Sequence, residues 1–213
     1  MIPSSLAAQE RVSIPTPDGG LIWADIYGAG SRGVVLAHGG RFDRASWATQ
    51  ARLLADAGFR AIAIEFRGEG ASHGGAPMRP GDDGYHFDVL GAVRYLRRTG
   101  AARVFVIGAS LGGDAAAEAA VEAAPGEIDR LVLLAGGAID TPARMQGSKL
   151  FIIARDDANA DGLRLPRFRT RYDRTPGPKR LIIVDGAAHA QFLFATGQAD
   201  RVMGEILRFL GAP

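Results

Sequence analysis

Short hydrophobic runs alternate along the chain with longer segments in which hydrophobic residues recur at helical spacing. Several of these runs, such as Val104–Ile107 and Leu131–Leu134, are apolar at every position. A strand that is covered on both faces needs this pattern, so the runs indicate a parallel sheet between helices. The predicted strands are Val12–Ile14, Leu21–Tyr27, Gly33–Ala37, Arg60–Glu65, Val104–Ile107, Leu131–Leu134, Leu150–Ala154 and Leu181–Val184.

The segments between most of these strands have helical periodicity. In the last segment Val202, Ile206 and Leu210 recur on one helix face, which predicts a buried stripe. The alternation predicts an α/β fold: a doubly wound, mostly parallel eight-stranded sheet with helices on both faces and two antiparallel strands first. The predicted helices are Trp47–Ala57, Tyr85–Arg98, Leu111–Ala123, Leu163–Arg171 and Asp200–Leu210.

Composition narrows the class of protein. The chain has 213 residues, 47% hydrophobic and 23% charged, which fits one globular domain over residues 1–213. The formal net charge is only +2 and the arginines read as scattered, so we expect no nucleic-acid partner. The sequence contains no run of 18 apolar residues, so it predicts no membrane span. Its first residues lack the features of a secretory signal, so we expect a cytoplasmic protein. The sequence does not indicate an oligomeric state.

The sharpest chemical motif is Gly108-Ala109-Ser110-Leu111-Gly112, which follows an apolar strand and opens an alanine-rich helix. A nucleophile elbow needs this order of strand, sharp turn and helix. Glycine two positions before and after the serine avoids a Cβ clash where the chain passes close to itself. Ser110 is therefore the candidate nucleophile, and the alternative is a glycine-rich turn without chemical meaning. The chain contains no cysteine, which excludes a cysteine nucleophile and a thiolate metal site.

A serine nucleophile needs a general base. His189 follows the last strand, in a loop at the same edge of the sheet as Ser110, and is the candidate base. The alternative for His189 is an ordinary surface histidine. A structural or substrate-contact role is expected for the remaining histidines, which are His38, His73 and His86.

The histidine in turn needs an orienting carboxylate. Asp156 and Asp157 both follow the strand Leu150–Ala154, and their side chains should point to different sides. We favour Asp157, with Asp156 as the alternative acid. The oxyanion would be held by the backbone N–H groups of Leu111 and Gly40, with the Arg41 N–H as the next choice.

These motifs together resemble the α/β-hydrolase superfamily over nearly the whole chain. The resemblance lies in His38-Gly39-Gly40 after the third strand, the stretch Glu65–Ser72 after the fourth, the GASLG elbow after the fifth, the acid after the seventh and Asp185–His189 after the eighth. It implies the α/β-hydrolase fold, a Ser-His-Asp triad and hydrolysis of an acyl bond, as in small carboxylesterases, acyl-thioesterases and dienelactone-hydrolase-like proteins.

One departure from larger members of the superfamily concerns the cap. Those members insert helices between the sixth and seventh strands, but here only residues 135–149 bridge them, so we expect an open site without a cap. Candidate walls of the substrate pocket are Arg41, Phe42, Trp47, Phe192 and residues 138–145. The aromatic residues could equally belong to the core.

Two other motifs are rejected. Residues 28–33 match GxGxxG, but a strand follows at once where a dinucleotide site needs a helix. Residues 157–162 match the start of a calcium loop, but Phe168 stands where its last glutamate should be. We therefore expect no metal and no cofactor.

The sequence favours a serine hydrolase that cleaves a carboxylic ester or thioester of a small acyl substrate. Peptidase, amidase and cofactor-free haloperoxidase activities are alternatives that would use the same triad. A ligand-binding protein without turnover is an alternative from a different class, because one fold can serve several functions. Acyl chain length and substrate identity are not encoded in these motifs.

Overall fold

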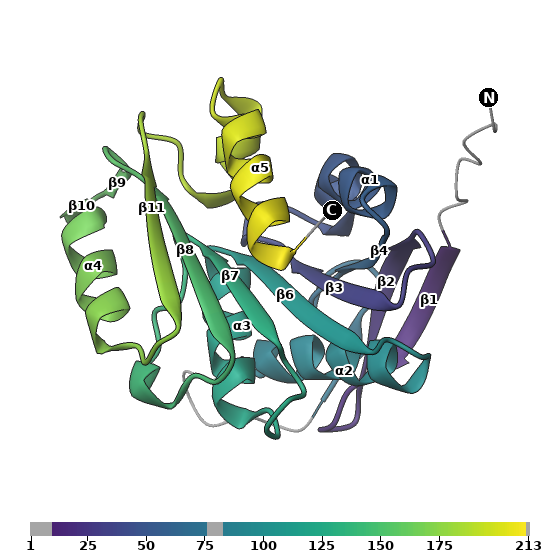
Figure 1. Ribbon diagram of the computed structural model, residues 1–213. Helices are drawn as coiled ribbons and strands as arrows, with labels where there is room; N and C mark the ends of the chain where they lie inside the picture. Colours follow the sequence, from purple (N-terminus) through teal and green to yellow (C-terminus); the bar gives the residue numbers. More distant parts are fainter. Residues whose placement is uncertain (1–9, 76–82, 212–213) are drawn as a thin grey trace, which may run out of the picture.

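The computed structural model describes residues 10–75 and 83–211, which form a sheet with helices on both faces (Figure 1). The strands follow one another across the sheet in the order β1-β2-β4-β3-β6-β7-β8-β11. Their bounds are β1 Glu10–Pro15, β2 Gly20–Tyr27, β3 Arg32–Ala37, β4 Phe59–Ile64, β6 Arg103–Ala109, β7 Arg130–Leu134, β8 Ser148–Ala154 and β11 Lys179–Val184.

The pairing of the strands confirms the predicted sheet. Pairs from β4 to β11 are parallel, whereas β1 with β2 and β2 with β4 are antiparallel. The sheet has one strand more than predicted, because the two-residue β5 (His73–Gly74) pairs with β2. In β3 and β6 the register runs from Arg32 opposite Arg103 to Ala37 opposite Gly108. This register brings the loop after β3 beside the turn after β6.

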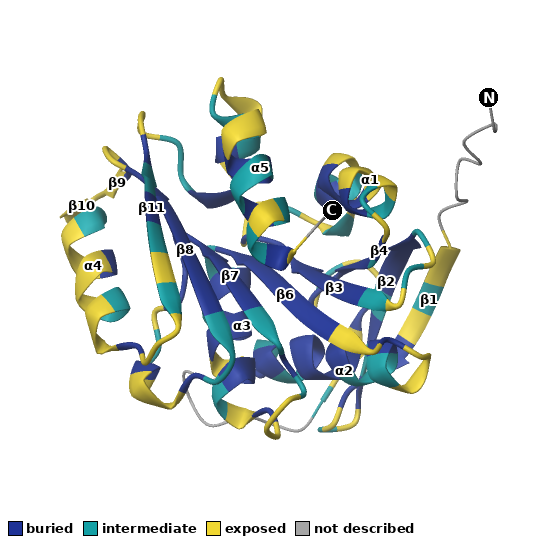
Figure 2. Ribbon diagram, viewed as in Figure 1, coloured by how far each residue is buried: buried dark blue, intermediate teal, exposed yellow. Residues whose placement is uncertain are grey.

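Five helices pack on the sheet, with α1 and α5 in front of it and α2 and α3 behind it in Figure 1, and α4 at its β8 and β11 end. Buried residues face the sheet and exposed residues face away, which explains the amphipathic periodicity (Figure 2). The central strands β3, β6, β7 and β8 are buried on both faces. The helices are α1 Ala48–Asp56, α2 Tyr85–Arg98, α3 Leu111–Glu122, α4 Leu165–Arg174 and α5 Ala199–Leu210.

The bounds of α4 differ from the prediction, which placed this helix at Leu163–Arg171. Leu163 belongs instead to a small hairpin of β9 (Ala158–Asn159) and β10 (Gly162–Leu163). Pro166 lies in the first turn of α4, where proline needs no hydrogen bond from its nitrogen. The helix therefore begins at Leu165, and the rejected calcium motif forms the turn before it.

The connection between β7 and β8 contains only one short 3₁₀ turn, Pro142–Arg144. The expectation that no cap covers the sheet here is therefore confirmed. Among the described residues, no helix is long and apolar enough to cross a membrane.

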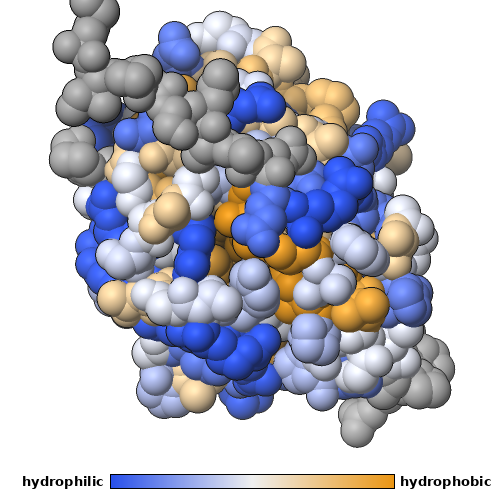
Figure 3. Space-filling view, turned by 90° about the vertical axis from the view of Figure 1, so that its right-hand side faces the viewer, coloured by the Kyte–Doolittle hydropathy of each residue, from blue (hydrophilic) through white to orange (hydrophobic). Residues whose placement is uncertain are grey.

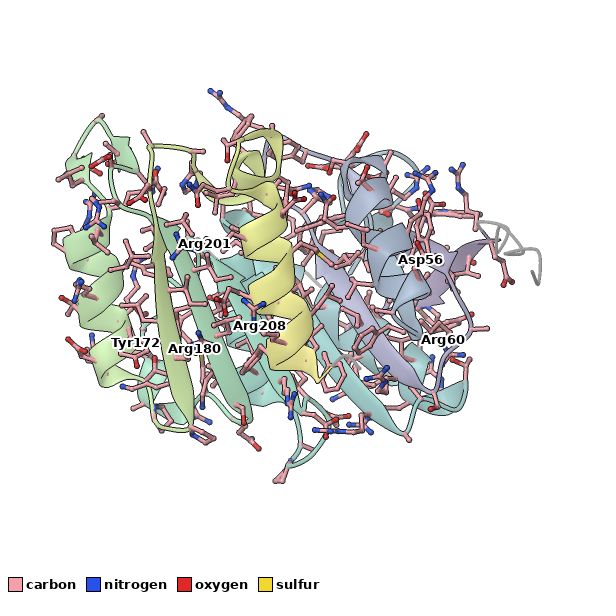
Figure 4. The ribbon with its side chains drawn as sticks, turned by 45° about the horizontal axis from the view of Figure 1, so that its top comes forward. Asp56, Arg60, Tyr172, Arg180, Arg201 and Arg208 are labelled. Atoms are coloured by element: carbon pink, nitrogen blue, oxygen red, sulfur yellow. The ribbon has the colours of Figure 1, made fainter. Side chains whose placement is uncertain are left out.

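The face of the molecule on the side of β1 and α1 is largely polar (Figure 3). It carries mainly hydrophilic and intermediate residues, with a smaller hydrophobic area near its middle (Figure 3). On the face with α5, Arg180 of β11 and Arg208 of α5 extend from neighbouring elements (Figure 4). Both ion-pair with Glu205 of α5, at 3.2 and 2.8 Å, and the pair with Arg180 links α5 to the edge strand.

Candidate active site

Ser110 lies in the sharp turn between β6 and α3 and has an unusual backbone conformation. Its φ of 50° and ψ of −117° belong to a region that residues with a side chain rarely adopt. Three hydrogen bonds hold the turn. The Ser110 N–H donates to the Leu134 carbonyl (2.9 Å), and the Ser110 carbonyl accepts from the N–H groups of Gly113 and Asp114. The surrounding sheet and helix therefore hold the Ser110 backbone in this strained conformation.

The glycines around Ser110 are required by close contact of backbone with backbone. A Cβ on Gly108 would lie 2.3 Å from the Gly112 carbonyl oxygen. A Cβ on Gly112 would lie 2.3 Å from the Ala37 carbonyl oxygen at the end of β3. The predicted close approach of the residues two before and two after the serine is thus present, and only glycine fits there.

His189 lies directly before a 3₁₀ helix (Ala190–Ala195) in the loop after β11. Its Nε2 is 2.8 Å from Ser110 Oγ, and its Nδ1 is 2.7 Å from Asp157 Oδ2. When Nδ1 carries the proton and donates to the carboxylate, Nε2 is left to accept the serine hydroxyl. The three residues therefore form one chain of hydrogen bonds.

The two adjacent acids lie in different environments. Asp157 is fully buried and faces His189, whereas Asp156 is exposed at the surface. The Asp156 N–H donates to the Gly186 carbonyl (3.0 Å), which fixes the backbone at this point. The structure thus brings Asp157 to Ser110 and His189 and leaves Asp156 outside the cluster.

The candidate oxyanion donors lie side by side. A Cβ on Gly40 would be 3.5 Å from Leu111 Cδ1, and one on Gly39 would be 3.6 Å from Ser110 Cβ. Among the described residues, the N–H groups of Gly40 and Leu111 have no hydrogen-bond acceptor. Leu111 is also the first residue of α3, where the helix dipole favours negative charge.

Gln191 was not found by sequence reasoning. Its side chain is 5% exposed; its Oε1 accepts the Gly39 N–H at 3.2 Å, and its Nε2 donates to Ser46 Oγ at 2.7 Å. Gln191 thereby ties the loop that carries His189 to the loop after β3. The partners are 152 and 145 residues away in sequence, and no local signal marks the contact.

A cavity of about 250 Å³ opens at Ser110. The rings of Phe42 and Phe192 lie 4.8 Å apart in its wall. Arg164, which sequence reasoning did not identify, also lines it. The full lining is Gly39, Gly40, Arg41, Phe42, Ser110, Leu111, Arg164, His189, Ala190, Gln191 and Phe192.

Two predicted wall elements lie elsewhere and are corrected here. Trp47 is fully buried in the core, where its ring packs edge-on against Phe194 at 5.8 Å. Residues 138–141 and Arg144 line a different cavity, beside His86 and α3. An aromatic residue at the start of a helix can face the core or the solvent edge, and for Trp47 the core is favoured because burial of a large ring contributes more.

The remaining histidines lie outside the hydrogen-bond chain of Ser110, His189 and Asp157. His73 is exposed, and the two ring nitrogens of His86 lie 3.5 Å from carboxylate oxygens of Glu118 and Glu122. His38 is fully buried beneath the Gly39–Gly40 loop, with its Nε2 3.3 Å from Glu69 Oε2.

Among the described residues, one group has the spacing of metal ligands: atoms of His38, Glu65 and Glu69 lie within 4.8 Å of one another. The guanidinium of Arg44 donates to Glu65, so one of the two carboxylates already has a cationic partner. Burial raises the pKa of Glu69, the other carboxyl of the group. We therefore assign the group to an ion-pair network that supports the loop after β3.

Comparison with known proteins gives a family and several structural neighbours. The profile of a family described as alpha/beta hydrolase fold matches residues 33–193. No curated protein sequence matches the chain. A protein of Thermoplasma acidophilum described as a predicted CIB-like hydrolase is similar in structure, with a TM-score of 0.75 and 20% identity over 96% of this chain and 98% of that one.

Two esterase structures are similar to a comparable degree. The Pyrococcus furiosus esterase Pf2001 has a TM-score of 0.72 and 19% identity, over 99% of this chain and 94% of its own. The esterase RhEst1 of Rhodococcus has a TM-score of 0.72 and 16% identity, over 95% of this chain and 99% of its own. At these low sequence identities, the structural similarity shows a shared fold and nothing further.

Proposed function

The chain belongs to the α/β-hydrolase fold family, and on this premise we propose that it is a serine hydrolase that cleaves a carboxylic ester or thioester. The observation that carries the proposal is the continuous hydrogen-bond chain from Ser110 Oγ through His189 to the buried Asp157, at 2.8 and 2.7 Å. Binding alone does not require this arrangement. The esterases among the structural neighbours support the same reaction class.

In the first half of the reaction Ser110 Oγ attacks the carbonyl carbon of the substrate while His189 Nε2 takes the hydroxyl proton. The buried Asp157 carboxylate stabilises the imidazolium that forms. The N–H groups of Gly40 and Leu111 hold the oxyanion of the tetrahedral intermediate. When the intermediate collapses, His189 gives its proton to the departing alcohol or thiol, and the acyl group remains on Ser110.

In the second half a water molecule attacks the acyl-enzyme. His189 removes a proton from this water and returns it to Ser110 Oγ when the carboxylic acid leaves. The cycle uses only side chains and backbone amides of this chain together with water.

A fluorophosphonate probe tests the proposal, because it reacts with an activated serine. We expect stoichiometric labelling of the wild type and loss of labelling in Ser110→Ala. The control is Ser13→Ala, which removes an exposed hydroxyl on β1 and should leave labelling intact. A folded wild type that is not labelled would overturn the proposal and favour a binding protein without turnover.

Substrate preference follows from a second measurement. A series of aryl esters and acyl thioesters of increasing chain length gives kcat/KM for each. We expect kcat/KM to rise with chain length until the acyl group covers the apolar part of the cavity, which Phe42, Leu111 and Phe192 line.

A further inference from the structure

The cavity at Ser110 combines an apolar wall with positive charge. Phe42, Leu111 and Phe192 supply the apolar part, while Arg41 and Arg164 are its cationic residues. No aspartate or glutamate is among the described residues that line it. Asp157, the nearest buried acid, lies behind His189 and is already hydrogen-bonded to that ring.

Arg164 is positioned by contacts with Asp157, the candidate catalytic acid. It lies between β10 and α4, and its backbone N–H donates to the Asp157 carbonyl at 2.8 Å. Its Nε is buried 3.4 Å from Asp157 Oδ1, without the alignment of a hydrogen bond. The Arg164 side chain as a whole is 35% exposed, so its exposed atoms are atoms other than Nε. One Asp157 carboxylate thus faces both Arg164 and His189, and the guanidinium keeps unused donors.

Arg41 supplies a second cation next to the candidate oxyanion loop. It is exposed, follows Gly40 directly, and makes no ion pair with any described residue. An arginine fork binds a carboxylate or phosphate with two parallel hydrogen bonds. Two arginines of this kind line the cavity at Ser110.

The helix after Arg164 adds to the positive field. Five arginines and one aspartate occur in residues 164–174, so the arginines are clustered here and not scattered as the whole sequence had suggested. Arg167 pairs with Asp161 at 3.3 Å, but the segment as a whole keeps an excess of positive charge. Of these five arginines, Arg164 alone is among the residues that line the cavity, and the other four lie along α4. Positive charge on this part of the surface raises the local concentration of anionic molecules.

We propose that the substrate is an ester or thioester that carries an anionic group, carboxylate or phosphate, recognised by Arg164 and Arg41. This inference rests on the proposed function and specifies its substrate class. The apolar wall would hold the hydrocarbon between the anionic group and the reacting carbonyl.

The test compares two aryl esters of similar length: the 4-nitrophenyl monoester of glutaric acid, which carries a carboxylate, and neutral 4-nitrophenyl pentanoate. We expect kcat/KM to be about 10- to 100-fold higher for the charged ester at low ionic strength, and the ratio to fall with added salt. In Arg164→Gln and Arg41→Gln the ratio should drop towards one. If Arg164 served only to orient Asp157, its replacement would slow both esters equally and leave the ratio unchanged.

The matched control is Arg98→Gln, an exposed arginine at the end of α2, on the opposite edge of the sheet, where the ratio should stay at the wild-type value. Competition by free glutarate and by inorganic phosphate against pentanoate hydrolysis identifies the preferred anion. Hydrolysis of both esters at equal efficiency, or competition by neither anion, overturns this inference alone. Failure to hydrolyse any ester, together with no labelling of Ser110, overturns the proposed function as well.

Discussion

Asp156 and Asp157 are neighbours in sequence, yet only Asp157 reaches His189. Its carboxylate is fully buried and 2.7 Å from His189 Nδ1. We expect Asp157→Asn to lower kcat by about 10⁴-fold, because an amide that donates to Nδ1 favours the wrong imidazole tautomer. Steady-state kinetics on an aryl ester measure the effect, and circular dichroism checks the fold.

Asp156→Asn provides the control at the neighbouring position. It changes an exposed side chain with the same loss of charge and should leave kcat within about twofold. Large losses in Asp156→Asn with near-normal rates in Asp157→Asn would contradict the assignment of the acid.

Single residues were predictable from sequence where their neighbours along the chain define their role. The glycines around Ser110 and the position of His189 after the last strand are of this kind. The positions of Arg164 and Gln191 at the cavity were not predictable, because they depend on contacts with segments brought close only by the fold. Trp47 shows the same limit, since the sequence pattern does not distinguish a core ring from a pocket ring.

At the scale of elements, the approach of β3, β6 and α3 depends on Gly112. A Cβ there would meet the carbonyl oxygens of Ala37 and His38 at 2.3 and 2.5 Å, and backbone atoms of a central strand cannot easily move away. We expect Gly112→Ala to lower the free energy of unfolding by at least 1–3 kcal/mol, roughly the cost of overpacking a core. Urea denaturation measures the loss.

Gly197→Ala is the matched substitution, because a Cβ at this exposed glycine would meet no atom within 4 Å. Its unfolding free energy should stay within about 0.5 kcal/mol of the wild type. Equal stabilities of Gly112→Ala and Gly197→Ala would show that the elbow relaxes more readily than its contacts indicate.

Gln191 makes two hydrogen bonds between the loop after β3 and the loop after β11. Gln191→Met keeps the size of the side chain but removes the acceptor of the Gly39 N–H and the donor to Ser46 Oγ. The Gly40 amide should then be positioned less accurately, and we expect kcat to fall about 10- to 100-fold. Ser46→Ala leaves the bond to the Gly39 N–H intact and should show a smaller loss, although it removes the bond between the Ser46 hydroxyl and the Asp43 carbonyl as well as the one from Gln191.

Gln146→Met is the control for this change. Gln146 also donates a side-chain hydrogen bond, to the Ala123 carbonyl at 2.9 Å, but does not line the cavity at Ser110. If both glutamine variants lose stability to a similar extent and only Gln191→Met loses activity, a positioning role is supported. A fully active Gln191→Met would exclude that role.

Elements were predictable in proportion to their length. Each strand of five residues or more was recognised, most of them because their apolar runs are long enough to stand out, whereas only Val12–Ile14 of β1 was predicted. The two-residue strands β5, β9 and β10 were missed, since two residues show no periodicity. The late start of α4 reflects the hairpin before it, which only the folded chain reveals.

At the scale of the whole molecule, the alternation of buried strands and amphipathic helices was sufficient to predict the fold class. It was not sufficient to predict which segments are tied together by charge. Arg67 links two such segments by ion pairs, with its Nη1 2.6 Å from Asp18 Oδ2 and its Nη2 2.7 Å from Asp88 Oδ1. It joins the turn between β1 and β2 to the start of α2, behind the sheet.

This network predicts how stability responds to acid. Burial raises the pKa of Asp18, but hydrogen bonds from Arg67 and Thr16 outweigh it and lower the pKa to about 2. An aspartate in the unfolded chain has a pKa of about 3.9, so this pair stabilises the fold above about pH 4, and its contribution is lost as the pH falls towards 2. Burial raises the pKa of the other partner, Asp88, so its contribution changes with the opposite sign. Substitution of Asp18 therefore isolates one component.

We expect Asp18→Asn to be less stable than the wild type above pH 4, and the difference in unfolding free energy to shrink towards zero between pH 4 and pH 2. Asp56→Asn is the control, because Asp56 is exposed on α1 and has no ion pair with the described residues (Figure 4). Its difference from the wild type should be small at every pH. A deficit of Asp18→Asn that stays constant from pH 6 to pH 2 would mean that the variant loses packing or a neutral hydrogen bond. The ion pair with Arg67 would then not be what stabilises this side of the sheet.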